Sequence, residues 1–456
     1  MNQRWTLHVE NFARIESADI EIAPLMCFIG DNNSGKSYIM SLLWGILSNS
    51  NLFYRKFKTS DAYDKCNHWL SQVIKKKNVV IKDETELIYL QWFNELLSDN
   101  KEELVKRIFN NENITIGKLE LRNFRRQKKL TVEFNKAIQF NVSHTHTTTI
   151  SKSEENDSIG ITIPIHSENF DAIYWKSNVF ICWNIIMMGL TDIFPMDGVI
   201  SQAVYLPASR TGFLLARREI VSKSIESLYS LPSSENNLQE RLTAPYIQFL
   251  QIMNNLRDSS ESDNNENTPL IEFLQEKLLY GNVIVKSNGK VIRYLPGDTD
   301  GKELPMSITS SVVTEIASLL LLLTTRLPLR LIIIEEPEAH LHPALQKKIA
   351  QFLIRLVHSG IPIWITTHSD TILQHFNNMI KLNNHSAERE ELMQEFNYSV
   401  EDLLTPEEIN LYQFERGEKH TAIKKLESGK YGFVANLFNK AIDELVNEIY
   451  AFQEVE

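Results

Sequence analysis

Apolar positions along the chain fall into two patterns, which together predict an α/β protein. Residues 5–22 alternate between apolar and polar positions, as strands do, with a turn near 11–14. Residues 25–29 form a short continuous apolar run, which is typical of a strand buried on both faces. From 304 to about 382, helix-like stretches alternate with further buried strands. We therefore expect a parallel-strand core that helices cover.

The remaining stretches predict elements around this core. In chain order they are a charged helical region at 51–115, several strands within 119–165, an apolar helical stretch at 168–200, a helical region at 213–257 with a break at 231–234, a polar flexible loop at 257–268, two strands within 282–295, and an amphipathic helix at 432–452. The apolar runs at 179–190 and 319–323 are too short to span a bilayer, so we interpret both as core.

Composition narrows the class of protein. With 456 residues the chain is expected to form two or three lobes, and its net charge of −11 argues against coating by nucleic acid over the whole surface. Basic residues cluster at 75–77 and 122–129, either on a solvated face or, less favoured, in a DNA-facing groove. His144 and His146 fit ordinary surface residues better than metal ligands. Three scattered cysteines and the lack of a signal-peptide pattern predict a cytoplasmic protein.

A phosphate-binding loop of the form GxxxxGKS follows the apolar run at 25–29. Its candidate ligand residues are Gly30, Asn32, Asn33, Ser34, Gly35, Lys36 and Ser37. Glycines let backbone N–H groups close around phosphate oxygens, and the helix N-terminus adds partial positive charge. Lys36 would reach the outer phosphates and Ser37 would bind Mg²⁺. The loop therefore predicts a site for ATP with Mg²⁺.

Two later strands end in residues that would complete this site. Residues 331–334 are apolar and lead into Glu335 and Glu336, and residues 361–365 lead towards His368. Because α/β sheets bind ligands at the carboxyl ends of their strands, we expect these side chains near the phosphates. Glu335 would support Mg²⁺ through water, Glu336 would polarise the attacking water, and His368 would sense the outer phosphate.

These motifs resemble those of the ABC-type ATPase heads of the SMC and OLD kind. Within that superfamily the chain looks most like the AAA-15/AAA-21 ATPases. The resemblance also includes residues 9–12, 205–210 and 335–343. The resemblance implies a P-loop head with a mixed sheet flanked by helices and an inserted helical arm. It also implies that residues 338–342 form the D-loop. Ser310 and Ser311 would contact ATP from a second copy, in an ATP-sandwich homodimer. The resemblance also suggests a larger ring, a trimer of such dimers. Val312 stands where such heads often have Gly, which favours slow or partner-gated hydrolysis.

On this resemblance we divide the chain at 212, 280 and 385. The parts are an N-terminal lobe of the head (1–212), a helical arm (213–280), a C-terminal lobe with the signature-like helix (281–385) and a mixed or helical extension (386–456).

No nuclease motif is evident in the sequence, so a separate effector is expected. The chain most resembles the ATPases of PARIS anti-phage systems (AriA-type), and next those of Septu systems (PtuA-type). This implies an ATP-dependent sensor and scaffold that holds a nuclease-like effector until a phage protein triggers its release. The alternatives are an OLD-like DNA-processing ATPase or nuclease, and a DNA-repair or chromosome-maintenance ATPase. Binding to nucleic acid stays open, and no membrane partner is expected.

Overall fold

The computed structural model divides the chain into two compact units, Met1–Ile22 with Leu42–Ala203, and Ala23–Ser41 with Val204–Glu456. The residues that the structure describes are 3–48, 52–53, 59–126, 129–137, 149–153, 158–164, 170–186, 203–229, 242–258, 267–287, 289–298, 301–325, 327, 329–385, 388–429, 432–435 and 446–452. His144, His146, the predicted break at 231–234 and most of the predicted loop at 257–268 lie outside these ranges.

The first unit combines strands with helices. One group of antiparallel strands consists of β1 (Gln3–Phe12), β2 (Ile15–Glu21) and β5 (Lys118–Arg126). A second group has the order β4 (Asn78–Val80), β6 (Thr131–Ala137), β8 (Ser158–Pro164) and β7 (Thr149–Ser153). The helices are α3 (Asp61–Val73), α4 (Asp83–Phe109) and α5 (Phe170–Ile186). The predicted turn near 11–14 is present, and Asn11 and Ala13 have positive φ.

The sheet of the second unit carries the predicted buried strands. Its order is β16 (Thr421–Leu426), β15 (Ile409–Arg416), β3 (Leu25–Gly30), β14 (Ile363–Thr367), β13 (Leu331–Glu335) and β9 (Ala203–Leu206). The four strands from β15 to β13 are parallel, whereas β16 is antiparallel to β15. β3, β14 and β13 are buried along their whole length, as continuous apolar runs predict.

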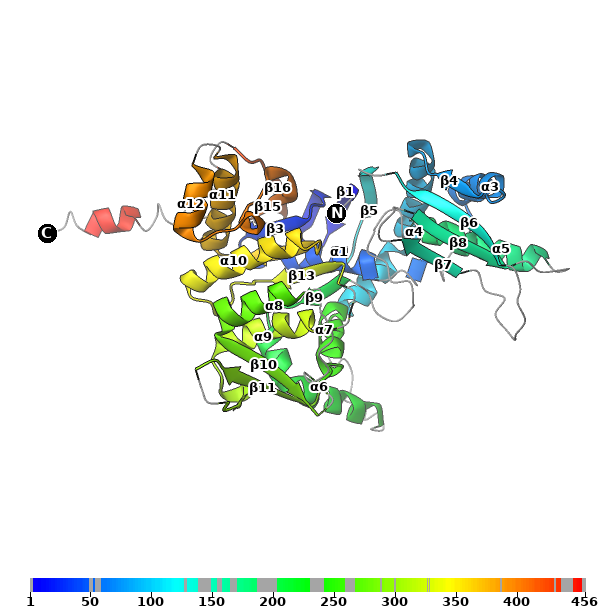
Figure 1. The fold of residues 1–456 in the computed structure, drawn as a ribbon. Helices are drawn as coiled ribbons and strands as arrows, with labels where there is room; N and C mark the ends of the chain where they lie inside the picture. Colours follow the sequence, from blue (N-terminus) through cyan, green and yellow to red (C-terminus); the bar gives the residue numbers. More distant parts are fainter. Residues whose placement is uncertain are drawn as a thin grey trace. The chain divides into compact units, whose positions relative to one another are not determined.

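Helices and a small hairpin flank this sheet. They are α1 (Lys36–Ser48), α6 (Arg210–Tyr229), α7 (Ala244–Asn254), α8 (Thr268–Leu274), α9 (Ser311–Leu323), α10 (Pro343–His358), α11 (Asp370–Asn384) and α12 (Arg389–Phe396), with β10 (Gly281–Lys286), β11 (Val291–Pro296) and β12 (Leu304–Pro305). Figure 1 shows α8, α9 and α10 together beside the sheet, and α8 contacts both α9 and α10. The α/β class, with a mixed sheet flanked by helices, is confirmed.

The predicted helical arm at 213–280 is helical where it is described. Leu214, Phe249 and Leu274 from its helices are buried in the same core as the strands of the second unit. The lobe boundaries at 212, 280 and 385 stay a prediction, because the compact units follow packing and not consecutive segments.

The apolar runs at 179–190 and 319–323 meet the expectation of core where they are described. They lie on α5 and α9, and the described residues of each are mostly buried. In the part of the chain that the structure describes, no helix combines the length and apolarity needed to cross a membrane. Of the predicted helix at 432–452, residues 446–452 are helical and 436–445 lie outside the described ranges, but 432–435 are not helical, so the predicted start at 432 is wrong.

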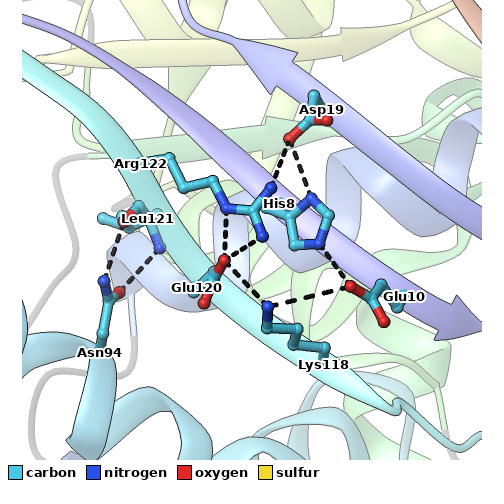
Figure 2. Close-up of polar contacts among 8 residues, drawn as sticks. All are labelled: His8, Glu10, Asp19, Asn94, Lys118, Glu120, Leu121 and Arg122. Atoms are coloured by element: carbon cyan, nitrogen blue, oxygen red, sulfur yellow. Dashed lines mark hydrogen bonds and ion pairs between the residues drawn. The ribbon is translucent and has the colours of Figure 1, made fainter.

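Arg122, the first residue of the basic cluster at 122–129, faces carboxylates on its own sheet (Figure 2). The Arg122 guanidinium donates a hydrogen bond to the Glu120 carboxylate and lies 3.6 Å from the Asp19 carboxylate. The His8 ring forms hydrogen bonds with the same Asp19 carboxylate and with Glu10. Lys118 adds a further ion pair to Glu120 at 3.2 Å. In the same strand, the Arg125 guanidinium donates to a carboxylate of β2 at 2.8 Å. Of this cluster, Arg122 and Arg125 therefore have carboxylate partners, which favours the solvated-face interpretation over a DNA-facing groove for these two residues.

Candidate nucleotide-binding site

The loop from Gly30 to Ser37 connects β3 to α1, as the motif predicts. Gly30 has a φ of +147° and passes so close to β15 that a Cβ here would lie 2.4 Å from the carbonyl oxygen of Phe414. Asn33 and Gly35 also have positive φ, at 59° and 97°. These three positions fold the backbone into a tight turn, and the requirement for small or αL-tolerant residues explains their identities.

Lys36 is the first residue of α1, and its side chain turns back over the loop. Its Nζ donates to the carbonyl oxygens of Gly30 at 2.9 Å and Asp31 at 2.8 Å. Burial lowers the pKa of Lys36 to about 8, although nearby carboxylates, of which Glu336 has the largest effect, oppose this. The ammonium group is therefore held inside the loop, where a phosphate would replace the two carbonyls as its partner.

The loop residues fit a nucleotide with Mg²⁺. Ser34 Oγ is buried and has no hydrogen-bond partner among the described residues. A buried hydroxyl normally has a partner, so this atom is available for a phosphate oxygen. Ser37 is exposed on the first turn of α1, where a hydroxyl would ligate Mg²⁺. Gly30 and Gly35 leave the backbone open, while Asn32 and Asn33 are exposed at the loop tip.

Glu335 ends strand β13 and its carboxylate is buried in a set of protein donors. Tyr205 O–H donates to Oε1 at 2.8 Å, and the Ala208 N–H and Tyr246 O–H donate to Oε2 at 3.1 and 3.3 Å. Burial, followed by the charge of Glu335, raises the pKa of Tyr205, so its hydroxyl stays protonated as a donor. The carboxylate is thereby fixed at the strand end, where it would support Mg²⁺ through water.

Glu336, the next residue, has a φ of 45°. Its N–H donates to the Thr366 carbonyl on β14 at 2.9 Å, and its side chain is 42% exposed. The positive φ is rare for a glutamate and turns the side chain away from the buried strand. An accessible carboxylate beside a phosphate loop is the arrangement that a general base for water needs.

His368 lies beyond the end of β14, and its Nε2 is 3.8 Å from Glu336 Oε1. Its backbone N–H donates to Glu338 Oε1 at 2.7 Å. Burial and then the positive charge of Lys36 lower the pKa of His368, so the imidazole is neutral at physiological pH. Burial raises the pKa of Glu338, even though the hydrogen bond from His368 opposes it.

The structure therefore brings Lys36, Glu335, Glu336 and His368 together at the carboxyl ends of adjacent parallel strands. Ser310 and Ser311 are at the start of α9, where Ser310 is the N-cap and its Oγ accepts from the Val313 N–H at 3.4 Å. Among the described residues, no hydrogen bond or ion pair connects these two serines to the phosphate loop. Their predicted contact with ATP in a second copy stays a prediction.

Sequence reasoning missed the groups that hold Glu335. Tyr205 belongs to the stretch 205–210, whose role was not assigned. Tyr246 comes from α7, and nothing in its local sequence marks it. The close partner of Gly30, Phe414, was missed as well because residues 409–416 were not recognised as a strand.

Comparisons with known proteins give one family match and several distant structural similarities. A family model described as AAA ATPase domain (AAA_15) matches residues 6–373. A comparison with curated proteins finds no match. One similar solved structure is an SmcHead bound to the C-winged helix domain of ScpA, with 11% identity, coverage of 93% of this chain and 98% of that chain, and a TM-score of 0.37. A second is an Smc head domain with an extended coiled coil bound to the C-terminal domain of ScpA from Pyrococcus furiosus, with 13% identity, coverage of 99% of this chain and 100% of that chain, and a TM-score of 0.38. A third is an SMC head domain from Thermotoga maritima, with 11% identity, coverage of 94% of this chain and 100% of that chain, and a TM-score of 0.35.

The solved structures are too distant, at these TM-scores, to carry an argument about the site. The family match covers most of the chain, including the phosphate loop, both glutamates and His368. The chain therefore belongs to the AAA_15 family of AAA ATPase domains.

Proposed function

We propose that the chain binds ATP with Mg²⁺ and hydrolyses it. The observation that carries this proposal is the convergence of Lys36, Glu335, Glu336 and His368 at the ends of three adjacent strands. Lys36 and the loop N–H groups would bind the phosphates, while Ser37 and Glu335 would hold the metal. Mg²⁺ supplies charge neutralisation on the phosphate oxygens when bound.

The carboxylate of Glu336 would accept a proton from the attacking water, and neutral His368 would orient that water or the outer phosphate. We expect Glu336→Gln to lower kcat about 100-fold or more while nucleotide binding is retained. Lys36→Ala should instead remove nucleotide binding. Steady-state phosphate release and the Kd of a fluorescent nucleotide separate the two effects. A Glu336→Gln protein that hydrolyses ATP at the wild-type rate would overturn the assignment of Glu336 as the general base.

We further propose that ATP closes a homodimer in which Ser310 and Ser311 of one copy reach the phosphate loop of the other. Ser310 supports this because it caps α9, so the first N–H groups of this 13-residue helix point towards an incoming anion. Light scattering of Glu336→Gln with ATP should show a dimer, and Lys36→Ala is the matched control that stays monomeric. A monomeric Glu336→Gln protein with bound ATP would contradict the model.

In the cell, we propose that this ATPase is the sensor and scaffold of an anti-phage system of the PARIS kind, with a Septu-type system as the second candidate. The support is the resemblance of its motifs, and the proposed role requires a separate nuclease-like effector. Phage plating on cells that carry the complete system tests this, because Lys36→Ala and Glu336→Gln should both abolish protection. Unchanged protection would refute it, and DNA cleavage by the pure protein would favour the OLD-like alternative.

A further inference from the structure

The stretch 205–210 ends in Arg210, a buried arginine to which the proposed function assigns no contact with phosphate or metal. Only 3% of Arg210 is exposed. Its Nη1 donates to the carbonyls of Glu335 at 2.7 Å and Pro207 at 3.3 Å, and its Nη2 donates to the carbonyl of Glu336 at 3.1 Å. One planar guanidinium thus holds two successive peptide carbonyls, one on each side of the Glu336 Cα.

The remaining nitrogen of this guanidinium lies next to the signature-like helix α9. Arg210 Nε lies 2.6 Å from Glu315 Oε2, and both side chains are almost completely buried. Thr211 Oγ1 donates to the other oxygen of Glu315 at 2.6 Å, and His340 Nε2 lies 3.9 Å from the same oxygen. Glu315 is therefore tied to the start of α6 and to the segment that follows Glu336.

The position of Glu315 makes this contact informative. It lies little more than one turn of helix beyond Ser310, the residue at the capped end of α9. A buried ion pair separates only at a high energetic cost, because each charge would be left without a partner in a poorly solvated place. The capped end of α9 and the strand end that carries Glu336 therefore move together, unless this ion pair breaks.

We propose that Arg210 is a positioning residue that transmits the position of the Ser310 end of α9 to the Glu336 main chain. The proposal rests on the proposed ATPase function and names how that site is regulated: contact with a second copy at Ser310 sets the orientation of the general base. The positive φ of Glu336 is compatible with this role, since its backbone is held by Arg210 on one side and by Thr366 on the other.

Two conservative variants and one matched control test the connection. Arg210→Lys keeps the charge but cannot form the planar fork, and Glu315→Gln keeps the shape but removes the charge. Arg217→Lys is the control. Arg217 is a second buried arginine on α6, but its guanidinium donates to the carbonyls of Gly289 and Lys290 and not to those of the two glutamates.

Amide hydrogen exchange measures the connection without requiring hydrolysis. Arg210→Lys and Glu315→Gln should each accelerate exchange of residues 336–341 by about 10-fold, although Glu315 lies on another element. Arg217→Lys should leave these amides within about 2-fold of the wild type. Acceleration that stays within α9 in Glu315→Gln would overturn the proposal. The same measurement in Glu315→Gln decides the matter if Arg210→Lys does not fold.

Kinetics then separate positioning from general stability. We expect each variant to lower kcat about 10-fold with a nearly unchanged nucleotide Kd, and the double variant to lose no more than the worse single variant. Independent, multiplying losses, or a Kd that weakens as much as kcat falls, would overturn the positioning role. If the wild type itself does not hydrolyse ATP, the proposed function fails, while the exchange experiment still decides whether Arg210 connects the two elements.

Discussion

The buried ammonium of Lys36 predicts that nucleotide affinity depends on pH in a range where most lysines are fully charged. Burial lowers the pKa of this group from 10.5 to about 8, which corresponds to about 3 kcal/mol disfavouring the charged form. Because this pKa is lowered, Lys36 is charged below about pH 8 and becomes neutral above it. A phosphate favours the charged form, so binding above that pH requires uptake of a proton.

The size of the effect follows from the fraction of protein that carries the charge. At about pH 9.5 only about 3% of Lys36 would be protonated, so the Kd for ATP should be about 30-fold weaker than near pH 7. Fluorescence titration at several pH values measures the Kd, and calorimetry in buffers of different ionisation heat counts the proton taken up.

Lys36→Arg is the matched control, because arginine stays charged throughout this range. Its Kd should change little between about pH 7 and about pH 9.5, whatever its absolute affinity. A wild-type Kd that is independent of pH would refute the reasoning, and so would a Lys36→Arg protein with the same pH dependence as the wild type.

Three further predictions concern the framework of the second unit. Arg355 donates to both carboxylate oxygens of the buried Asp402, at 2.6 and 3.0 Å. Asp402→Asn leaves Arg355 without this charged partner, so chemical denaturation should show a free energy of unfolding lower by about 3–5 kcal/mol. A loss below about 1 kcal/mol would contradict this. Gly30→Ala should lower the thermal midpoint and weaken ATP binding, since its Cβ would clash with Phe414; an unchanged midpoint would contradict the clash. The hydrogen bond that the His358 imidazole donates to the Glu408 carboxylate raises the pKa of His358 despite burial, so its stabilisation is present below the ordinary pKa of 6.5 and lost as pH rises through the raised value. The difference in denaturation midpoint between wild type and His358→Gln should therefore be larger at acidic than at alkaline pH, and an equal difference would contradict it.

The part of the site that could be predicted from sequence is the part that local pattern encodes. A glycine loop after an apolar strand fixes the positions of Lys36 and Ser37 relative to the backbone. Glu335 and His368 each follow a continuous apolar run, and parallel buried strands bring their carboxyl ends to one edge. That these strand ends lie near the phosphate loop was therefore expected from the pattern of apolar runs, even though about 300 residues separate Lys36 from Glu336.

The groups that the sequence did not reveal depend on pairings between distant segments. Strand β15, Ile409–Arg416, lies directly beside β3, but it carries polar residues among its buried ones and has no flanking motif. Tyr246 reaches Glu335 from a helix nearly 90 residues earlier in the chain. Arg210 belongs to the stretch 205–210, which is part of the family resemblance. Its partner Glu315 lies in an apolar helix, where nothing in the local sequence indicates an ion pair with a residue about 100 positions earlier.

The hydrogen bonds of the site imply that nucleotide binding is an exchange of partners. Lys36 donates to two loop carbonyls, and Glu335 accepts from two tyrosines and one amide. The proposed function assigns Lys36 to the phosphates and Glu335 to Mg²⁺, so binding replaces or shares hydrogen bonds that already exist. Such an exchange yields a small net free energy from large opposing contributions. Under the proposed function, affinity is then sensitive to changes in the groups that donate to the Glu335 carboxylate, Tyr205, Ala208 and Tyr246. Arg210 instead holds the main-chain carbonyls of Glu335 and Glu336, so its loss is expected to lower kcat and leave the nucleotide Kd nearly unchanged.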